Sequence, residues 1–153
     1  TILKPREDFP NQYKSIARGK QVGLSINVHE SQWYQDTYSK DIVAALKETL
    51  TAHNLTNITE VDAQSLPIVI SSYNLDDLIT LSEWTDFPLV QSVLFNQSIT
   101  YDYNEIATYC HGVKAEVGNL LWYYEPYSED YFATGYSEFV TQMHNRNLAV
   151  HVY

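Results

Sequence analysis

The chain alternates between two hydrophobic patterns, one with the period of a β-strand and one with the period of a helix. Residues 22–29 (VGLSINVH) place apolar and polar side chains in turn, which is typical of a strand with one buried face. Residues 40–53 instead carry an apolar stripe at helical spacing, and we expect Ser39 to cap the start of this helix. The stripe consists of Ile42, Val43, Leu46 and Leu50.

The same patterns continue to the end of the chain. Pro67 precedes a β-branched strand at residues 68–72, and we expect Asn74 to cap the next helix, whose first turn is acidic. We expect further strands at 89–95, 112–117 and 148–152, and further helices at 102–109 and 137–145. Five strands separated by four helices predict a parallel α/β sheet, either doubly wound or a barrel.

Composition and charge exclude several classes of protein. The 153 residues are 44% hydrophobic and 18% charged, which is ordinary for a globular domain. A single cysteine, Cys110, excludes an internal disulfide and a multi-cysteine zinc site. The net charge of −10 disfavours nucleic acid and anionic membranes as partners, and no apolar run is long enough to span a bilayer. Since no glycine-rich loop follows a strand, a nucleotide-binding loop has no support.

Positive charge gathers at the start of the chain. Residues 1–20 hold five of the nine Lys and Arg side chains and two of the nineteen Asp and Glu. We interpret this stretch as a basic lead-in segment with a solvated face, which could form a helix. Residues 21–153 then make up the α/β portion.

Several motifs, in order, resemble the glycerophosphodiester phosphodiesterases, particularly the periplasmic bacterial type. They are GLSINVHESQWY at 23–34 with KDIVAAL at 40–46, IVISSYNLDDL at 68–78, PLVQ at 88–91, EIATYCHGV at 105–113 and NLAVHVY at 147–153. Each motif is weak by itself, but their order and spacing over residues 20–153 are more specific.

The resemblance implies a TIM-type (β/α)₈ barrel, of which this chain would supply strands three to seven. A complete barrel of this type needs about 250 residues, so we expect an incomplete barrel and a chain that is an internal piece of a longer protein. The missing strands, and with them the family's catalytic histidines, would come from the rest of the same barrel or from another polypeptide.

The family's site positions carry unusual residues here. The resemblance places Asn27 where relatives have a metal-binding Glu, and His29 where they have Lys. An amide in place of a carboxylate removes a unit of negative charge, so binding of calcium or magnesium should weaken. We expect alternation to point Ser25, Asn27 and His29 into the barrel mouth.

Other positions of the motifs support the same interpretation. Ser71 replaces a family Gln, Lys114 lies where the family has I-G-P, and Val152 replaces a Pro, whereas Gln91 and His151 match the family. These departures together favour a barrel that has kept its scaffold and lost its hydrolytic site, acting as a binding or structural module.

Three alternatives stay open. The chain could belong to an active metal-dependent phosphodiesterase, using calcium or magnesium, with catalytic histidines outside this sequence. It could be a flavodoxin-like interaction domain whose likeness to the family is accidental. His29 and His151 could also be ordinary hydrogen-bonded histidines at strand ends. A triad of Ser71, His151 and Asp102 has no support from spacing.

Three Asn-x-Ser/Thr sites occur, at Asn54, Asn57 and Asn96. The first two fall in one polar connection, whereas Asn96 follows a predicted strand and would lie at the barrel mouth. Because secretion is common in the family that the chain resembles, we expect an extracellular or secretory-pathway protein.

Overall fold

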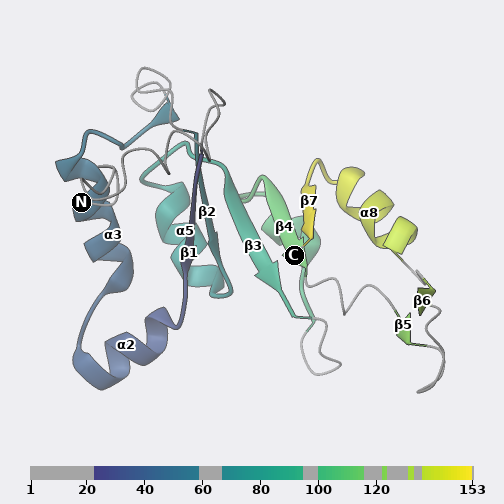
Figure 1. Cartoon of the computed structure of the whole chain (residues 1–153), viewed down its shortest axis with the longest axis horizontal. Helices are drawn as coiled ribbons and strands as arrows, with labels where there is room; N and C mark the ends of the chain where they lie inside the picture. Colours follow the sequence, from purple (N-terminus) through teal and green to yellow (C-terminus); the bar gives the residue numbers. More distant parts are fainter. Residues whose placement is uncertain are drawn as a thin grey trace, which may run out of the picture.

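The computed structural model describes residues 23–58, 67–94, 100–115, 122–123, 131–132 and 136–152. Five of its strands form one parallel sheet in the order β1-β2-β3-β4-β7 (Figure 1). The strands are β1 (Leu24–Val28), β2 (Ile68–Ser72), β3 (Leu89–Val93), β4 (Gly112–Ala115) and β7 (Ala149–Val152). The predicted parallel α/β sheet of five strands is therefore confirmed.

The described helices are α2 (Ser31–Tyr38), α3 (Ile42–Ala52), α5 (Leu75–Ser82), α6 (Tyr103–Ile106) and α8 (Tyr136–His144). Two short strands, β5 (Trp122–Tyr123) and β6 (Tyr131–Phe132), pair antiparallel with each other. The basic lead-in segment at residues 1–20 lies outside the described residues.

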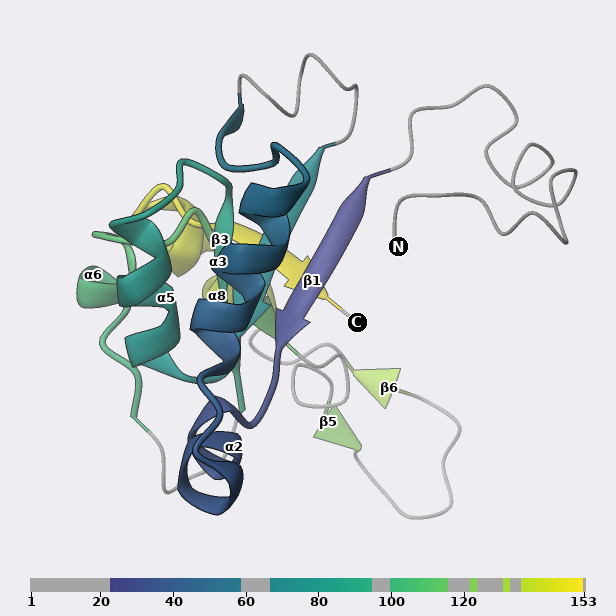
Figure 2. The same cartoon turned by 90° about the vertical axis from the view of Figure 1, so that its left-hand side faces the viewer.

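The sheet is wound in one direction only. Each strand pairs with the strand of the same sheet that follows it in the sequence. A doubly wound or flavodoxin-like sheet requires a reversal of this order, which the observed sheet lacks. Figure 2 shows α3, α5, α6 and α8 on one face of the sheet, with α2 at its carboxyl end. Order and helix placement thus both differ from the doubly wound alternative.

The hydrophobic core lies between the sheet and these helices. Strand residues such as Ile70 and Val113 are fully buried there against Leu78 and Leu81 of α5 and Met143 of α8. The two faces of the sheet are therefore chemically different, and the side chains that point away from the helices can form a site.

One helix and one cap differ from the sequence prediction. Helix α2 brings the number of described helices to five rather than four. Ser39 does not cap α3, because it ends α2 in the left-handed conformation (φ 51°). The cap of α3 is Asp41, whose carboxylate accepts the backbone N–H of Ala44 at 2.8 Å. The predicted cap at Asn74 is confirmed, with its side chain accepting from the N–H of Asp76.

Candidate functional site

Alternation along β1 separates its polar side chains from the core. Leu24, Ile26 and Val28 pack on the hydrophobic core, whereas Ser25 and Asn27 are exposed. The predicted alternation of polar and apolar side chains between the two sides of this strand is confirmed. Residues that pair across a parallel sheet share a face, so the register extends this assignment from β1 to the other four strands.

We call the face turned away from the helices the open face. The pairs Asn27 with Ser71, Ser71 with Val90, Val90 with Gly112 and Gly112 with Ala149 form one row across it. Val90 is buried, but it does not belong to the hydrophobic core between the sheet and the helices. This agrees with its place on the face turned away from the helices.

Asn27 and Ser71 are joined by a hydrogen bond. The Ser71 hydroxyl donates to Asn27 Oδ1 at 3.0 Å, and Ser71 is 3% exposed whereas Asn27 is exposed. The amide oxygen of Asn27 is thus already engaged by a side chain of the neighbouring strand.

A second row of polar residues lies one step nearer the carboxyl end of the sheet. Ser92 pairs with Lys114, and Lys114 pairs with His151. His29 and Tyr73 directly follow β1 and β2, and their rings meet edge to face with centroids 5.7 Å apart. We call this set the carboxyl-end row; it consists of His29, Tyr73, Ser92, Lys114 and His151.

Gln91 lies on the opposite face, apart from the other site positions. It pairs with Ser72 and Val113, points to the helices and is 1% exposed. Its Nε2 lies within 3.3 Å of the carbonyl oxygens of Ser72, Tyr73 and Ser92, to which it donates. Gln91 therefore fixes the backbone at the carboxyl end of β2 and β3 and does not reach the open face.

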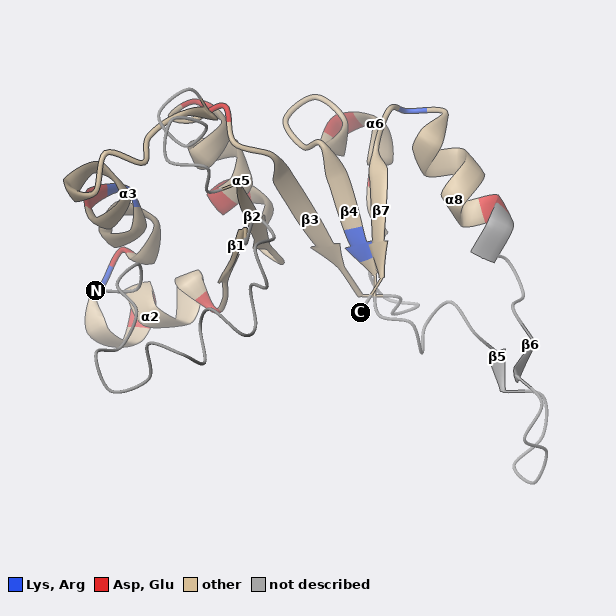
Figure 3. Cartoon of the chain, turned by 45° about the horizontal axis from the view of Figure 1, so that its top comes forward, with Lys and Arg blue, Asp and Glu red and all other residues tan. Residues whose placement is uncertain are grey.

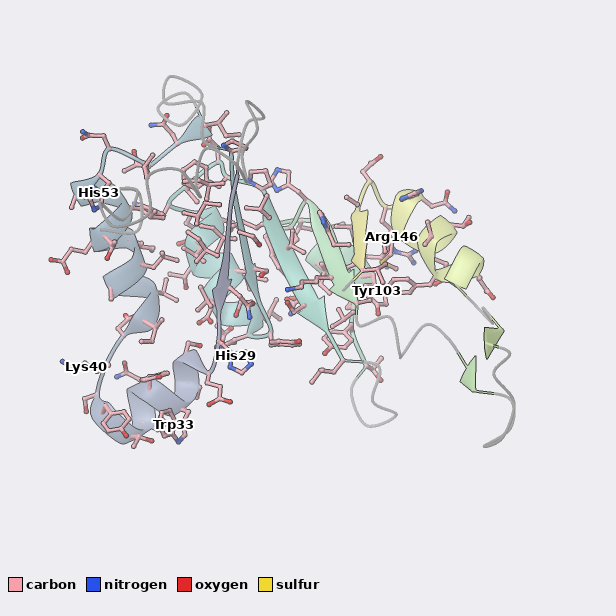
Figure 4. The ribbon with its side chains drawn as sticks, in the orientation of Figure 1. His29, Trp33, Lys40, His53, Tyr103 and Arg146 are labelled. Atoms are coloured by element: carbon pink, nitrogen blue, oxygen red, sulfur yellow. The ribbon has the colours of Figure 1, made fainter. Side chains whose placement is uncertain are left out.

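A cavity of about 530 Å³ opens at the carboxyl ends of β1 and β2. Its lining includes His29, Glu30, Gln32, Tyr73, Asn74 and Asp76. His29 Nδ1 lies 3.6 Å from a carboxylate oxygen of Glu30, and both side chains are more than half exposed. Figure 4 shows His29 at this end of β1, with Trp33 on α2.

Buried hydrogen bonds hold the turn beside this cavity. The carboxylate of Asp77, 6% exposed, accepts the Ser72 hydroxyl at 3.0 Å and the Asn74 side-chain amide at 3.2 Å. Asn74 Nδ2 also donates to the hydroxyl of Ser31 at the start of α2. This network ties the end of β2 to the first residue of α2.

The sequence interpretation missed Glu30, Tyr73 and Asp77 as parts of this region. Glu30 and Tyr73 come one or two residues after a strand ends, which is where ligand-binding residues gather in parallel α/β sheets. That position was the available signal for both. Asp77 was recognised only as an acid in the first turn of a helix, because burial cannot be read from helical spacing.

The residues present do not fit a site for the calcium or magnesium ion that the resemblance implies. Within the described part of the chain, no three His, Cys, Asp or Glu side chains come together in a way that could hold a metal ion. Hard cations prefer several carboxylate ligands, and Asn27 offers one amide oxygen that already accepts a hydrogen bond.

The remaining titratable candidates serve the fold. His111 Nδ1 accepts the backbone N–H of Leu89. Burial raises the pKa of the Cys110 thiol to about 12, so it stays protonated and unreactive at neutral pH. Ser71 and His151 are separated by two intervening strands and Asp102 caps α6, so the triad is not assembled.

The described sequons lie at the amino end of the sheet. Asn54 is exposed, and Asn57 is half-buried in the same loop. Asp86 Oδ1 accepts the N–H of Ile58, which anchors this loop beside the start of β3. Asn96, the sequon expected at the mouth, lies outside the described residues.

No protein-family model matches the chain, and no curated protein matches it significantly. None of the described helices combines the length and the apolar character needed to cross a membrane.

Proposed function

We propose that this chain is part of a glycerophosphodiester phosphodiesterase-like barrel that has lost its hydrolytic site and acts as an extracellular binding or structural module. The hydrogen bond between Ser71 and Asn27 is the observation that carries the proposal. It satisfies an uncharged amide at the position where the family's metal-binding carboxylate is expected, and it gives that amide a structural role.

The sheet supports the barrel part of the proposal. A barrel requires strands in sequential order, helices on the outer face and side chains packed on the inner face. The observed strand order and helix placement are compatible with five consecutive strands of such a barrel. The row of residues from Asn27 to Ala149 would then lie on the inner face.

Within the described sheet, β1 and β7 each pair on one side only. The open backbone groups of an edge strand attract another strand. The partners of this module are therefore the strands that complete the barrel, from the same protein or from another polypeptide, and a glycerophosphodiester-like small molecule is the ligand class to test first.

Release of glycerol 3-phosphate from glycerophosphocholine, measured with calcium, with magnesium and with a chelator, tests the loss of activity. We expect no metal-dependent turnover from the 153-residue chain or from a longer protein that contains it. Turnover that is abolished by Asn27→Ala, but kept by Ser25→Ala on the same face of β1, would overturn the proposal.

The second candidate function is an active metal-dependent phosphodiesterase whose catalytic histidines lie outside this chain. The retained His151 on the open face favours it. Any sequence that precedes Thr1 would distinguish the two candidates. An H-R-G motif followed by E-x-D and H-D favours the enzyme, and their absence favours the non-catalytic module.

Localisation is tested at Asn54, which is exposed and lies far from the carboxyl-end row. After expression in a secreting eukaryotic cell, we expect a glycosidase to increase the electrophoretic mobility of the chain. Asn54→Gln should remove at least part of this shift if the site is used.

A further inference from the structure

Helix α2 presents a group of exposed aromatic side chains. Within the helix only Ser31 is buried. Trp33, Tyr34 and Tyr38 are 47%, 38% and 56% exposed, and in the described part of the chain no other Trp, Tyr or Phe is as open to solvent. A cluster of this kind marks an interaction surface, whereas single exposed apolar residues are ordinary. The other large apolar side chains that stay exposed among the described residues are scattered singly; they are Ile58, Leu94 and Val152.

The three rings pack against one another and belong to no part of the described core. The Trp33 ring meets those of Tyr34 and Tyr38 edge to face, with centroids 5.0 Å and 5.2 Å apart. Figure 4 shows Trp33 on the side of α2 that is turned away from the sheet. We call these three residues the aromatic platform. Their mutual contacts restrict the rings before any partner arrives, which lowers the entropic cost of binding.

Acidic side chains surround the aromatic platform. Residues 30–41 carry three Asp and Glu side chains and one lysine. Glu30 precedes the helix and Asp36 lies within it, and both are exposed (Figure 3). The helix itself contains no Lys or Arg. The charge around the aromatic platform therefore favours a cationic partner over an anionic one.

A cavity of about 240 Å³ lies beside α2, next to the first turns of α3 and α5. Its lining includes the carboxylates of Asp41, Asp76 and Asp77 and no Lys or Arg. Asp77 is buried and already accepts two hydrogen bonds, whereas Asp41 and Asp76 are exposed. We call this space the acid-lined cavity. A cationic side chain that entered it would meet carboxylates and no competing cation.

The chain itself contains one contact between a cation and an aromatic ring. Lys47 Nζ lies 5.9 Å from the centre of the Trp84 ring, which is within the range of a cation–π interaction. Among the described residues, no Lys or Arg occupies this position over a ring of the aromatic platform. Arginine would suit the platform better than lysine, because its planar guanidinium stacks on aromatic faces and forms two parallel hydrogen bonds to a carboxylate.

We propose that the aromatic platform and the acid-lined cavity together form a docking surface for an arginine-rich segment of a separate partner polypeptide. The guanidinium groups of this segment stack on the exposed rings and bond to the carboxylates beside them. About half of each ring is exposed, so the platform offers about 300 Å² from side chains that can each bury 150–250 Å². This area is small for a stable interface, so we expect a transient, salt-sensitive complex of roughly micromolar affinity.

The docking surface does not depend on the proposed function. It uses none of the family-site positions on the sheet, such as Asn27, Ser71 and His151. The presence or the loss of hydrolytic activity therefore leaves the inference unchanged, and failure of either proposal leaves the other standing.

Fluorescence anisotropy of a labelled peptide that alternates arginine and serine, mixed with the 153-residue chain, tests the docking surface. We expect saturable binding that weakens as salt is added. A peptide with lysine in place of arginine should bind about fivefold more weakly, because it loses the stacking and the paired hydrogen bonds. A peptide with uncharged citrulline in place of arginine should not bind.

Aromatic variants then locate the binding. Trp33→Ala should weaken it about thirtyfold, the usual loss at an aromatic residue central to an interface. Trp33→Phe keeps an aromatic face and should recover most of the affinity. Ile58→Ala is the matched control, because this exposed apolar residue lies at the amino end of the sheet. It should bind as the native chain does, and all three variants should keep the native midpoint of thermal unfolding.

Charge variants test the electrostatic part. Asp36→Asn should weaken binding about threefold and reduce its salt dependence, while the amide oxygen can still accept the hydrogen bond from Gln32. Glu48→Gln makes the same change in net charge at an exposed position of α3. It should leave the affinity unchanged. Equal effects of the two variants would mean that net charge, and not the docking surface, attracts the peptide.

Other outcomes would overturn the proposal. One is no binding of the arginine peptide, and another is equal binding by Trp33→Ala and the native chain. Self-association of the native chain that Trp33→Ala abolishes would assign the surface to a second copy. Cosedimentation with phosphatidylcholine vesicles that Trp33→Ala abolishes would assign it to a membrane. Tighter binding of a peptide of residues 1–20 than of the arginine peptide would assign it to the basic start of this chain.

Discussion

The hydroxyl of Ser71 donates a 3.0 Å hydrogen bond to Oδ1 of Asn27, across the ladder that joins β2 to β1. One partner is buried and the other is exposed, so the bond links the interior of the open face to its edge.

A double-mutant cycle measures this contact. Asn27→Ala, Ser71→Ala and the double variant should show a coupling energy of about 0.5–1.5 kcal/mol in urea unfolding, the usual net value of a hydrogen bond. The two single changes remove the same bond, so their costs should not add. Strictly additive costs would show that the bond contributes nothing to stability.

The buried carboxylate of Asp77 should matter more for stability. Asp77→Ala leaves the Ser72 hydroxyl and an N–H of the Asn74 side chain without their shared acceptor. We expect the free energy of unfolding to fall by about 2–6 kcal/mol, from about 1–3 kcal/mol for each of the two donors left without an acceptor. Asp76→Ala, an exposed change in the same helical turn, should cost less than about 1 kcal/mol. Equal costs for the two variants would argue against the network.

Cys110 should give stability a pH dependence. Its pKa is about 12 in the folded chain against an ordinary value of 9.0, so the unfolded thiol loses its proton first as pH rises. The contribution is complete below pH 9 and is lost progressively above it, because the folded state then binds more protons than the unfolded state.

Urea unfolding at pH 8 and at pH 10 measures this effect. Wild type should lose more stability between the two pH values than Cys110→Ala, which lacks the thiol. A thiol-specific reagent at pH 8 should also modify Cys110 far more slowly in buffer than in urea. Equal rates in the two solvents would mean that the thiol is accessible in the folded chain.

Gly112 should not tolerate a side chain. A Cβ at this position would lie 2.8 Å from the carbonyl oxygen of Ala149 on the adjacent strand. We expect Gly112→Ala to destabilise the chain by about 1–3 kcal/mol in urea unfolding, because the two strands must move apart. Adding Ala149→Gly should restore little, since the nearest obstacle is backbone. Full recovery in the double variant would place the conflict at the Ala149 side chain instead.

The strands were predictable because each one has a regular pattern and a clear boundary. Residues 68–72, opened by Pro67, match β2 residue for residue. The other four strands were placed to within a few residues of their observed ends, where fraying and flanking polar residues blur any pattern.

Helix α2 was not predictable in the same way. Its sequence, SQWYQDTY, has no apolar stripe, and Trp33, Tyr34 and Tyr38 all remain exposed. Its N-cap residue, Glu30, has a left-handed conformation (φ 53°), and no side-chain hydrogen bond caps the start of the helix. A helix held by its connections rather than by a buried face leaves no periodic signal.

The candidate site was predicted only where alternation was visible. β1 has exposed and packed residues in turn, so the direction of Asn27 followed from the sequence. β3 is buried on both faces, and its sequence LVQSV gives no indication that Gln91 points to the helices while Ser92 points away. Only the register of β3 with the neighbouring strands shows to which face of the sheet each of these two side chains points.

The carboxyl-end row takes one residue from each of five chain segments, and a whole connection separates every member from the next. No short peptide of this chain can therefore reproduce it. A reagent whose binding needs the exposed members of the row, His29 and His151, together would therefore report whether the sheet has assembled.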